Sequence, residues 1–162
     1  MLNPYAVVLG NQSALDILPA TSGKVHAILG QLGPKSVGQT PAPGKWSARE
    51  IVSHLADCEI VFGFRLRQTI AEDNYVIQPF DQEKWAASYA AYDASAAFAV
   101  FSTLRQWNLA FIKGVAAEKM AKTVTHPERG TMTFSAIVET MAGHDLNHLQ
   151  QLEKLNQQLS PA

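Results

Sequence analysis

The sequence is poor in the residues on which several classes of protein depend. Its one cysteine, Cys58, excludes a disulfide within the chain and any zinc or iron–sulfur site built from several cysteines. Lysine and arginine total 13, aspartate and glutamate 14, and a net charge of −1 provides no basic field for nucleic acid or an anionic membrane. No stretch of about 18 residues is continuously apolar, so no membrane span is expected. The first ten residues lack a basic segment ahead of their apolar ones, which argues against a signal peptide and makes the cytoplasm the expected location.

Several catalytic motifs are missing as well. Neither Gly-x-Gly-x-x-Gly nor a Walker loop occurs, so no nucleotide site is predicted. The nucleophile elbow Gly-x-Ser-x-Gly is absent, and no glutamate precedes a histidine by three residues, as paired di-iron motifs require. A zincin needs His-Glu-x-x-His with the glutamate as base, whereas His144 is followed by Asp145, which is one methylene shorter.

What the sequence contains predicts one helical domain over residues 1–162. The length fits a single domain, and 47% hydrophobic residues are enough for a full core. Glycine and proline cluster between Gly30 and Gly44, which predicts a loop, and a second connection is expected over residues 72–81. Residues 122–133 carry β-branched residues on both sides of Pro-Glu-Arg-Gly, which predicts a small hairpin.

The remaining stretches show helical features. Ser47 and Glu50 form a capping box ahead of an apolar run, and Asp93 is a candidate N-cap. The first helix is predicted over residues 4–32, and Pro19 opens its second part. The other three are predicted over residues 47–71, 94–117 and 134–159. The fold class is therefore all-α, an antiparallel four-helix bundle with a short additional segment between the third and fourth helices.

Three histidines form a candidate metal site. His144 and His148 are four residues apart, so both lie on one face of the last helix, at a spacing that lets two imidazoles share one ion. On a helical wheel these two, and His54 of the second helix, lie on or beside the apolar stripe. Neutral imidazole binds zinc, nickel, copper(II) and iron(II), and the sequence does not choose between them. The alternative is that all three are ordinary buried histidines bonded to carbonyls or carboxylates.

Four other polar residues are candidates for supporting this site or lining a pocket. Asp57 could accept the second ring N–H of His54, although it also fits an exposed helix carboxylate. Asp145 lies near the apolar centre of its helix and needs a partner, either at the site or on a lysine or arginine. Gln151 and Asn108 lie on faces that could meet the site or a pocket, and Cys58 reads as a small core residue.

Two segments resemble the DinB-like superfamily, which includes YfiT-like proteins. They are Gly44–Glu59, around Trp46-Ser47 and His54, and His144–Leu152. The resemblance implies a four-helix bundle with one divalent metal, zinc, nickel or iron, held by His54, His144 and His148. It also implies chemistry on small molecules, either metal-dependent hydrolysis or transfer of a low-molecular-weight thiol, with no binding of nucleic acid.

We therefore predict an enzyme in which a divalent metal activates water or a low-molecular-weight thiol for attack on a small electrophile. A metal-binding or stress-related bundle without turnover is the alternative, and a metal-free helical scaffold is the third. A homodimer is expected on general grounds, since helical bundles often leave an apolar face for a second copy.

Overall fold

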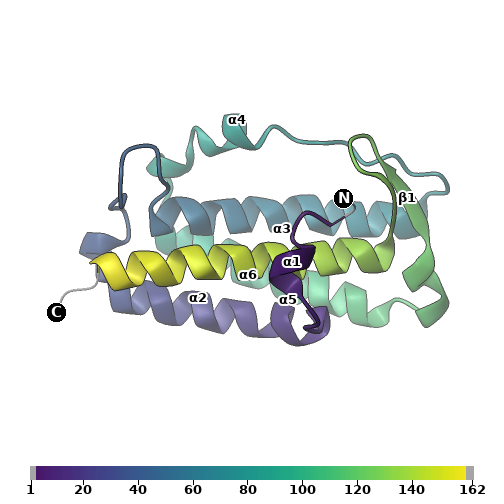
Figure 1. The fold of residues 1–162 in the computed structure, drawn as a ribbon, viewed down its shortest axis with the longest axis horizontal. Coiled ribbons are helices and arrows are strands. Elements are labelled where there is room, and N and C mark those ends of the chain that lie inside the picture. Colours follow the sequence, from purple (N-terminus) through teal and green to yellow (C-terminus); the bar gives the residue numbers. More distant parts are fainter. Residues whose placement is uncertain (1–2, 160–162) are drawn as a thin grey trace.

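The computed structural model describes residues 3–159, which form a bundle of four long helices (Figure 1). All four lie along the long axis of the molecule: α2 (Ala14–Ser36), α3 (Ala48–Ala71), α5 (Ala94–Gly114) and α6 (Phe134–Leu159). The predicted all-α four-helix bundle is confirmed. No helix in the described part of the chain is both long and apolar enough to span a membrane.

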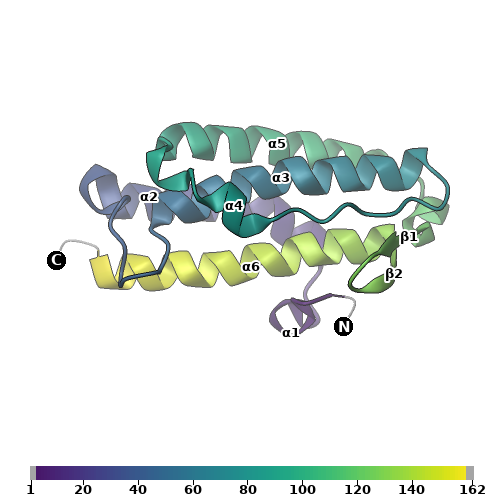
Figure 2. The ribbon, with the colours of Figure 1, turned by 90° about the horizontal axis from the view of Figure 1, so that it is seen from above.

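The helices form two oppositely directed pairs. α3 and α5 pack together and point the same way, while α2 and α6 pack together and point the other way (Figures 1 and 2). Residues 72–93 return the chain from the end of α3 to the start of α5 along one side of the bundle, with α4 (Gln82–Ala86) and η1 (Tyr89–Ala91) on the way. α3 and α6 are antiparallel and in contact. α3 carries His54, and α6 carries His144 and His148.

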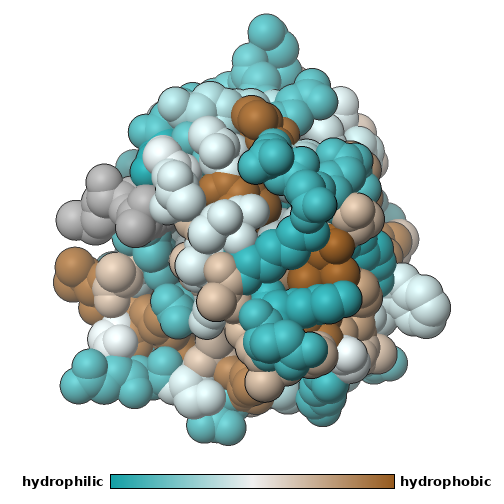
Figure 3. Space-filling view, turned by 90° about the vertical axis from the view of Figure 1, so that its right-hand side faces the viewer, coloured by the Kyte–Doolittle hydropathy of each residue, from teal (hydrophilic) through white to brown (hydrophobic). Residues whose placement is uncertain are grey.

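A short segment separates α5 from α6, as predicted. It contains η2 (Ala117–Ala121) and a hairpin of β1 (Thr123–His126) and β2 (Gly130–Thr133). Gly130 closes the turn with φ of 80°, a conformation that favours glycine. The return segment joins the hairpin, because the Ile77 N–H donates to the Thr125 carbonyl at 2.8 Å. At this end of the molecule, small hydrophobic patches are divided by hydrophilic side chains (Figure 3).

Local capping explains where two of the helices begin. The Ser47 hydroxyl accepts from the Glu50 N–H, and the Glu50 carboxylate accepts from the Ser47 N–H at 2.8 Å, so the capping box is confirmed. Asp93 caps α5 by accepting from the Ala96 N–H at 2.8 Å. Such caps satisfy backbone donors that a helix leaves free at its start.

The predicted boundaries are wrong at three places. The first helix is interrupted, because α1 (Ala6–Leu9) ends at Gly10, which has φ of 57°, and α2 begins only at Ala14. The loop expected from Gly30 starts later, since the helix breaks at Gly33 (φ 69°) and then resumes to Ser36. Pro34 suits this restart, because its fixed φ fits the first turn of a helix. α5 ends at Gly114 rather than at residue 117.

The buried interior consists of two apolar clusters with a polar layer between them. One cluster lies toward the hairpin and includes Leu66, Phe134 and Ile137, and the other, toward the opposite end, includes Phe101 and Leu152. The buried polar layer lies at mid-height and contains His54, Glu59, Arg105, Asn108, His144, Asp145 and His148. Buried polar groups are costly unless they are paired, so this layer is where function is expected.

Candidate metal centre

The centre lies where α3 and α6 face each other. α3 supplies His54 and Cys58, and α6 supplies His144 and His148, so each helix contributes two side chains spaced four residues apart. That spacing places both side chains of a pair on one helical face. All four are buried, with His54 1% exposed and the others 5%.

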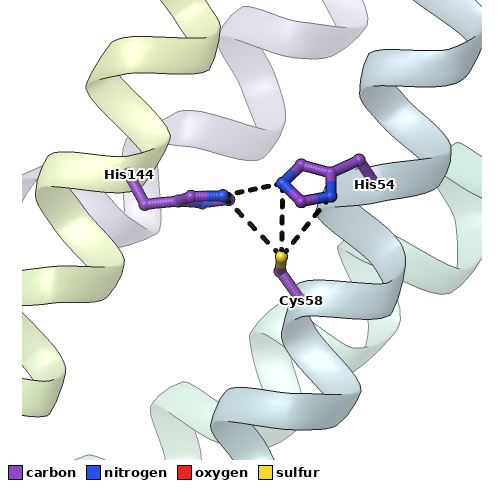
Figure 4. Close-up of side chains that lie close together, drawn as sticks. All are labelled: His54, Cys58 and His144. Atoms are coloured by element: carbon purple, nitrogen blue, oxygen red, sulfur yellow. Dashed lines mark hydrogen bonds between the residues drawn. The ribbon is translucent and has the colours of Figure 1, made fainter. Parts of the chain in front are cut away.

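Three donor atoms converge to distances that suit a metal ion. His54 Nε2 lies 3.0 Å from His144 Nε2, and Cys58 Sγ lies 3.5 Å and 3.7 Å from these two nitrogens (Figure 4). Around zinc, bonds of about 2.0 Å to nitrogen and 2.3 Å to sulfur would separate tetrahedral donors by roughly 3.3–3.7 Å. His54, Cys58 and His144 are therefore a group that could hold a metal ion.

His148, the third histidine of the predicted triad, lies beside the converging donors but is not one of that group, in which Cys58 takes its place. Its ring centroid lies 4.4 Å from that of His144 and 4.8 Å from that of His54. Its Nδ1 lies 3.0 Å from the Gln151 Oε1. An amide oxygen only accepts, so Nδ1 carries the proton and the lone pair remains on Nε2. Gln151, which the sequence suggested only as a residue able to meet the site or a pocket, thus fixes the tautomer of His148.

Aromatic rings surround the histidines. The Trp46 indole stacks on the His148 ring at 6.4 Å between centroids and lies 5.0 Å from that of His54. Tyr5 and Phe62 meet the His144 ring edge-on, at 5.4 Å and 5.9 Å. These rings restrict access of water to the nitrogens and hold the imidazoles in place.

This burial keeps the metal-free histidines neutral. Desolvation, with a smaller effect from His148, lowers the pKa of His54 to about 3. Desolvation also lowers the pKa of His144 and His148. Burial raises the pKa of the Cys58 thiol, and nearby carboxylates add to that effect. The imidazoles are therefore in the protonation state that binds metal, while the thiol would release its proton only on binding one.

An ion cluster lies directly beside the donors. Arg105 of α5, 2% exposed, bonds Glu59 at 2.5 Å and also pairs with Asp145. Glu59 and Asp145 are chain neighbours of Cys58 and His144. Asp145 is thus paired with an arginine, which was one of its two predicted outcomes.

Asn108 and Asp57 differ from their predicted roles. Asn108 is buried and donates to the Glu59 Oε2 at 3.0 Å, so it belongs to the ion cluster rather than to a pocket wall. Asp57 accepts from the Tyr89 hydroxyl at 2.8 Å and makes no hydrogen bond to His54 within the described residues. Spacing would allow the contact, since residues three apart are neighbours on a helix, but the Asp57 carboxylate is engaged by the Tyr89 hydroxyl instead.

A cavity of about 100 Å³ opens beside two of the donors, Cys58 and His144. Its wall is partly apolar and partly basic. The other lining residues are Tyr5, Val61, Phe62, Arg65, Ile77, Phe80, Gln82, His126, Arg129, Met132, Ile137 and Thr140. A small molecule in this cavity would lie next to the donor group.

Sequence reasoning missed Cys58 as a donor. Its position four residues after His54 repeats the spacing of His144 and His148, and that repetition was the available signal. The cavity is also lined by His126. It lies in β1 and is buried.

Comparison with known proteins agrees with this picture. The sequence model of the DinB superfamily matches residues 18–152, and the chain belongs to that superfamily. A protein of Oceanobacillus iheyensis named "Putative metal-dependent hydrolase" is 27% identical over 113 residues, which are 69% of this chain and 66% of that protein. A Bacillus cereus protein of the same name is 28% identical over 72% of this chain and 68% of its own. The chain thus spans about two thirds of the length of these relatives.

A solved structure has the same fold. It is YfiT from Bacillus subtilis, described as a probable metal-dependent hydrolase with an unusual four-helix bundle topology. The match has a TM-score of 0.82 with 18% identity, and it covers 89% of this chain and 84% of that one.

Proposed function

We propose that this protein is a metal-dependent hydrolase of small molecules, with the metal held by His54, His144 and His148. The observation that carries the proposal is the convergence of His54 and His144 from α3 and α6, together with Cys58, beside a cavity. His148 is included because its ring lies next to theirs, with its centroid 4.4 Å from that of His144. The names of the relatives support the same reaction class. A divalent ion in such a set lowers the pKa of a bound water toward neutrality and so supplies a nucleophile.

The chain's own residues provide orientation and exclusion of water. Gln151 holds His148 in the tautomer that presents Nε2, and Trp46 packs against two of the three rings. The Arg105 cluster ties α5 to α3 and α6 one residue away from Cys58 and His144. These contacts fix the ligands before any ion arrives, which lowers the entropy lost on binding.

Cys58 supports a second candidate, a metal-binding protein without turnover. If its thiolate joined the three histidines, four protein donors would close the coordination sphere, as in structural zinc sites. Three donors leave one position open for substrate or water. The two candidates therefore differ in whether Cys58 is a ligand.

Metal analysis of single variants separates these candidates. We would measure metal per chain by mass spectrometry for untagged wild type, His144→Ala, His148→Ala and Cys58→Ala. The hydrolase predicts about one ion per chain in wild type, loss in both histidine variants, and retention in Cys58→Ala. If Cys58→Ala lost the metal and His148→Ala retained it, the metal ligands would instead be His54, Cys58 and His144.

Two further measurements complete this test. Cobalt(II) substitution reports a thiolate ligand through a charge-transfer band, which should be absent in the hydrolase and present in the closed site. Turnover of a panel of small esters and amides should appear in wild type and disappear in His144→Ala. A wild type that takes up no zinc, nickel or iron(II) would contradict both candidates.

Transfer of a low-molecular-weight thiol remains a prediction, because water and thiol are activated by the same metal chemistry. Adding free thiols and a small alkylating electrophile to the same assay tests it. The predicted homodimer and cytoplasmic location also remain predictions. Light scattering on the purified chain would test the dimer.

A further inference from the structure

The cavity beside Cys58 and His144 contains two arginines that the proposed chemistry does not use. Arg65 extends from α3, and Arg129 lies in the turn of the hairpin, so two distant segments bring positive charge to one wall. Among the cavity's lining residues within 3–159 there is no aspartate or glutamate, and neither arginine forms an ion pair there.

Arg65 is only partly satisfied. Its Nη2 donates to the Gln78 carbonyl at 3.2 Å, but its Nε is buried and has no hydrogen-bond partner in the described part of the chain. Burial lowers the pKa of Arg65, and the nearby charge of Arg129 adds to that effect. A buried guanidinium N–H without an acceptor is costly, and a second cation beside it raises the cost. An anion in the cavity would relieve both.

His126 adds a neutral donor to the same wall. It is buried, and its Nδ1 accepts from the Glu128 N–H at 3.2 Å, so in the neutral ring the proton is on Nε2. Burial and the charges of Arg129 and Arg65 lower the pKa of His126, which favours that neutral form. The wall therefore presents donors and cations and lacks a negative partner.

The basic wall lies within the length of a small molecule from the metal donors, because Arg65 and Cys58 are on the same helix, α3. Arg65 follows Cys58 by seven residues, which is about 10 Å along the helix axis. Side chains on a helix lean toward its N-terminus, so Arg65 leans back toward Cys58. Phe62 and Ile137 contribute apolar surface to the same cavity.

We propose that this cavity recognises the substrate by an oxyanion, a carboxylate or phosphate, held between Arg65 and Arg129, with a short apolar portion leading to the metal donors. The inference rests on the proposed function and narrows its substrate class to small amphiphilic anions. Guanidinium groups match carboxylate and phosphate with paired hydrogen bonds. The volume of about 100 Å³ is far below the roughly 300–1,000 Å³ of pockets for drug-sized ligands, so the ligand is small.

The test compares two probes of equal shape, butyrate and neutral butyramide, by NMR titration of the full chain in metal-loaded and metal-free form. Wild type should bind butyrate at least about tenfold more tightly than butyramide in both forms. Arg65→Gln and Arg129→Gln should each abolish most of that preference. Metal content should not change in either variant. Arg49→Gln, which removes an α3 arginine outside the cavity, should keep the preference.

The outcomes separate this inference from the metal proposal. Equal binding of the two probes by wild type, no binding of either, or an unchanged preference in both cavity variants would overturn the oxyanion site. A preference that requires metal and survives both substitutions would overturn it too, since the anion would then be a metal ligand. The metal-free measurement decides the inference even if the hydrolase proposal fails. Arg129 lies in an exposed turn, so its variant remains informative if Arg65→Gln does not fold.

Inorganic phosphate then tests which oxyanion the cavity accepts. If phosphate displaces butyrate, the recognised head group includes phosphates, and if it does not, the head group is limited to carboxylates.

Discussion

Replacing Arg105 by methionine should destabilise the protein more than any single change on its surface. The guanidinium is 2% exposed and bonds two carboxylates, Glu59 at 2.5 Å and 3.1 Å and Asp145 at 3.0 Å through its Oδ1, and it also donates to the Leu18 carbonyl at 3.0 Å. Both carboxylates are as buried as the arginine. Methionine keeps much of the length of the side chain but leaves two negative charges without a cation.

The size of the effect follows from that uncompensated charge. Removing one partner of a buried ion pair costs about 3–5 kcal/mol. For a domain of this size, each kcal/mol lowers the melting temperature by roughly 2–4 °C, so the expected drop is about 6–20 °C.

Urea unfolding and calorimetry at neutral pH measure this loss, with Glu59→Gln as the matched control. The cluster formally carries one positive and two negative charges, so Glu59→Gln makes it neutral and leaves Arg105 paired with Asp145. Its cost should be that of weakened hydrogen bonds, about 1–2 kcal/mol. If Arg105→Met cost no more than Glu59→Gln, the assignment of Arg105 as the cation that neutralises the cluster would be refuted.

Two other predictions follow from close packing and from the buried histidines. A Cβ at Gly63 would lie 2.6 Å from the Asn108 Oδ1, so Gly63→Ala should lose about 1–2 kcal/mol by urea unfolding, whereas Gly23→Ala, which meets nothing within 4 Å, should gain up to about 1 kcal/mol. Loss of stability in Gly23→Ala equal to that of Gly63→Ala would contradict this. Because burial lowers the pKa of His54 from 6.5 to about 3, the unfolded chain binds a proton below pH 6.5 that the metal-free folded state does not. As the pH falls from 6.5 toward 3, the stability of the metal-free protein should therefore decrease by up to about 1.4 kcal/mol per pH unit from this group. A urea midpoint that stays constant from pH 7 to 4.5 would exclude a buried, neutral His54.

The sequence predicted the helices well where local signals were strong. The capping box at Ser47 and the N-cap Asp93 set the starts of α3 and α5, because these contacts lie within a few residues of each other. The last helix has the predicted bounds, Phe134–Leu159. The break between α1 and α2 was missed because its signal, Gly10 with positive φ, is weak beside the surrounding apolar residues. The loop was predicted to start too early, at Gly30, because glycine and proline are strong signals for a loop. In the structure a single kink at Gly33 does not end the helix, which continues to Ser36.

The polar contacts were harder to predict because they depend on how helices are rotated against each other. A helical wheel indicates that a side chain lies toward the core, but not which neighbour it meets there. Cys58 therefore read as a core residue although its sulfur lies 3.5 Å from His54 Nε2. Arg105 had no sequence signal at all, since an arginine in a helix normally lies at the surface. Asp145 showed that a partner was needed, and only the structure identified it.

The position of the polar layer also bears on function. Two apolar clusters occupy the ends of the bundle, and the histidines and the Arg105 cluster occupy the space between them. Well-packed apolar residues in place of a buried ion cluster often leave a protein as stable or make it more stable. Stability alone therefore gives no reason to bury Arg105, Glu59 and Asp145 beside the donors. A role in holding α3, α5 and α6 at a fixed spacing would give such a reason. The donors of the centre come from two of these helices and the arginine comes from the third.

On this argument, a variant that replaces all three charged residues by apolar ones should match the wild type in stability and still bind metal more weakly. That combination would identify the cluster as a positioning device for the metal centre.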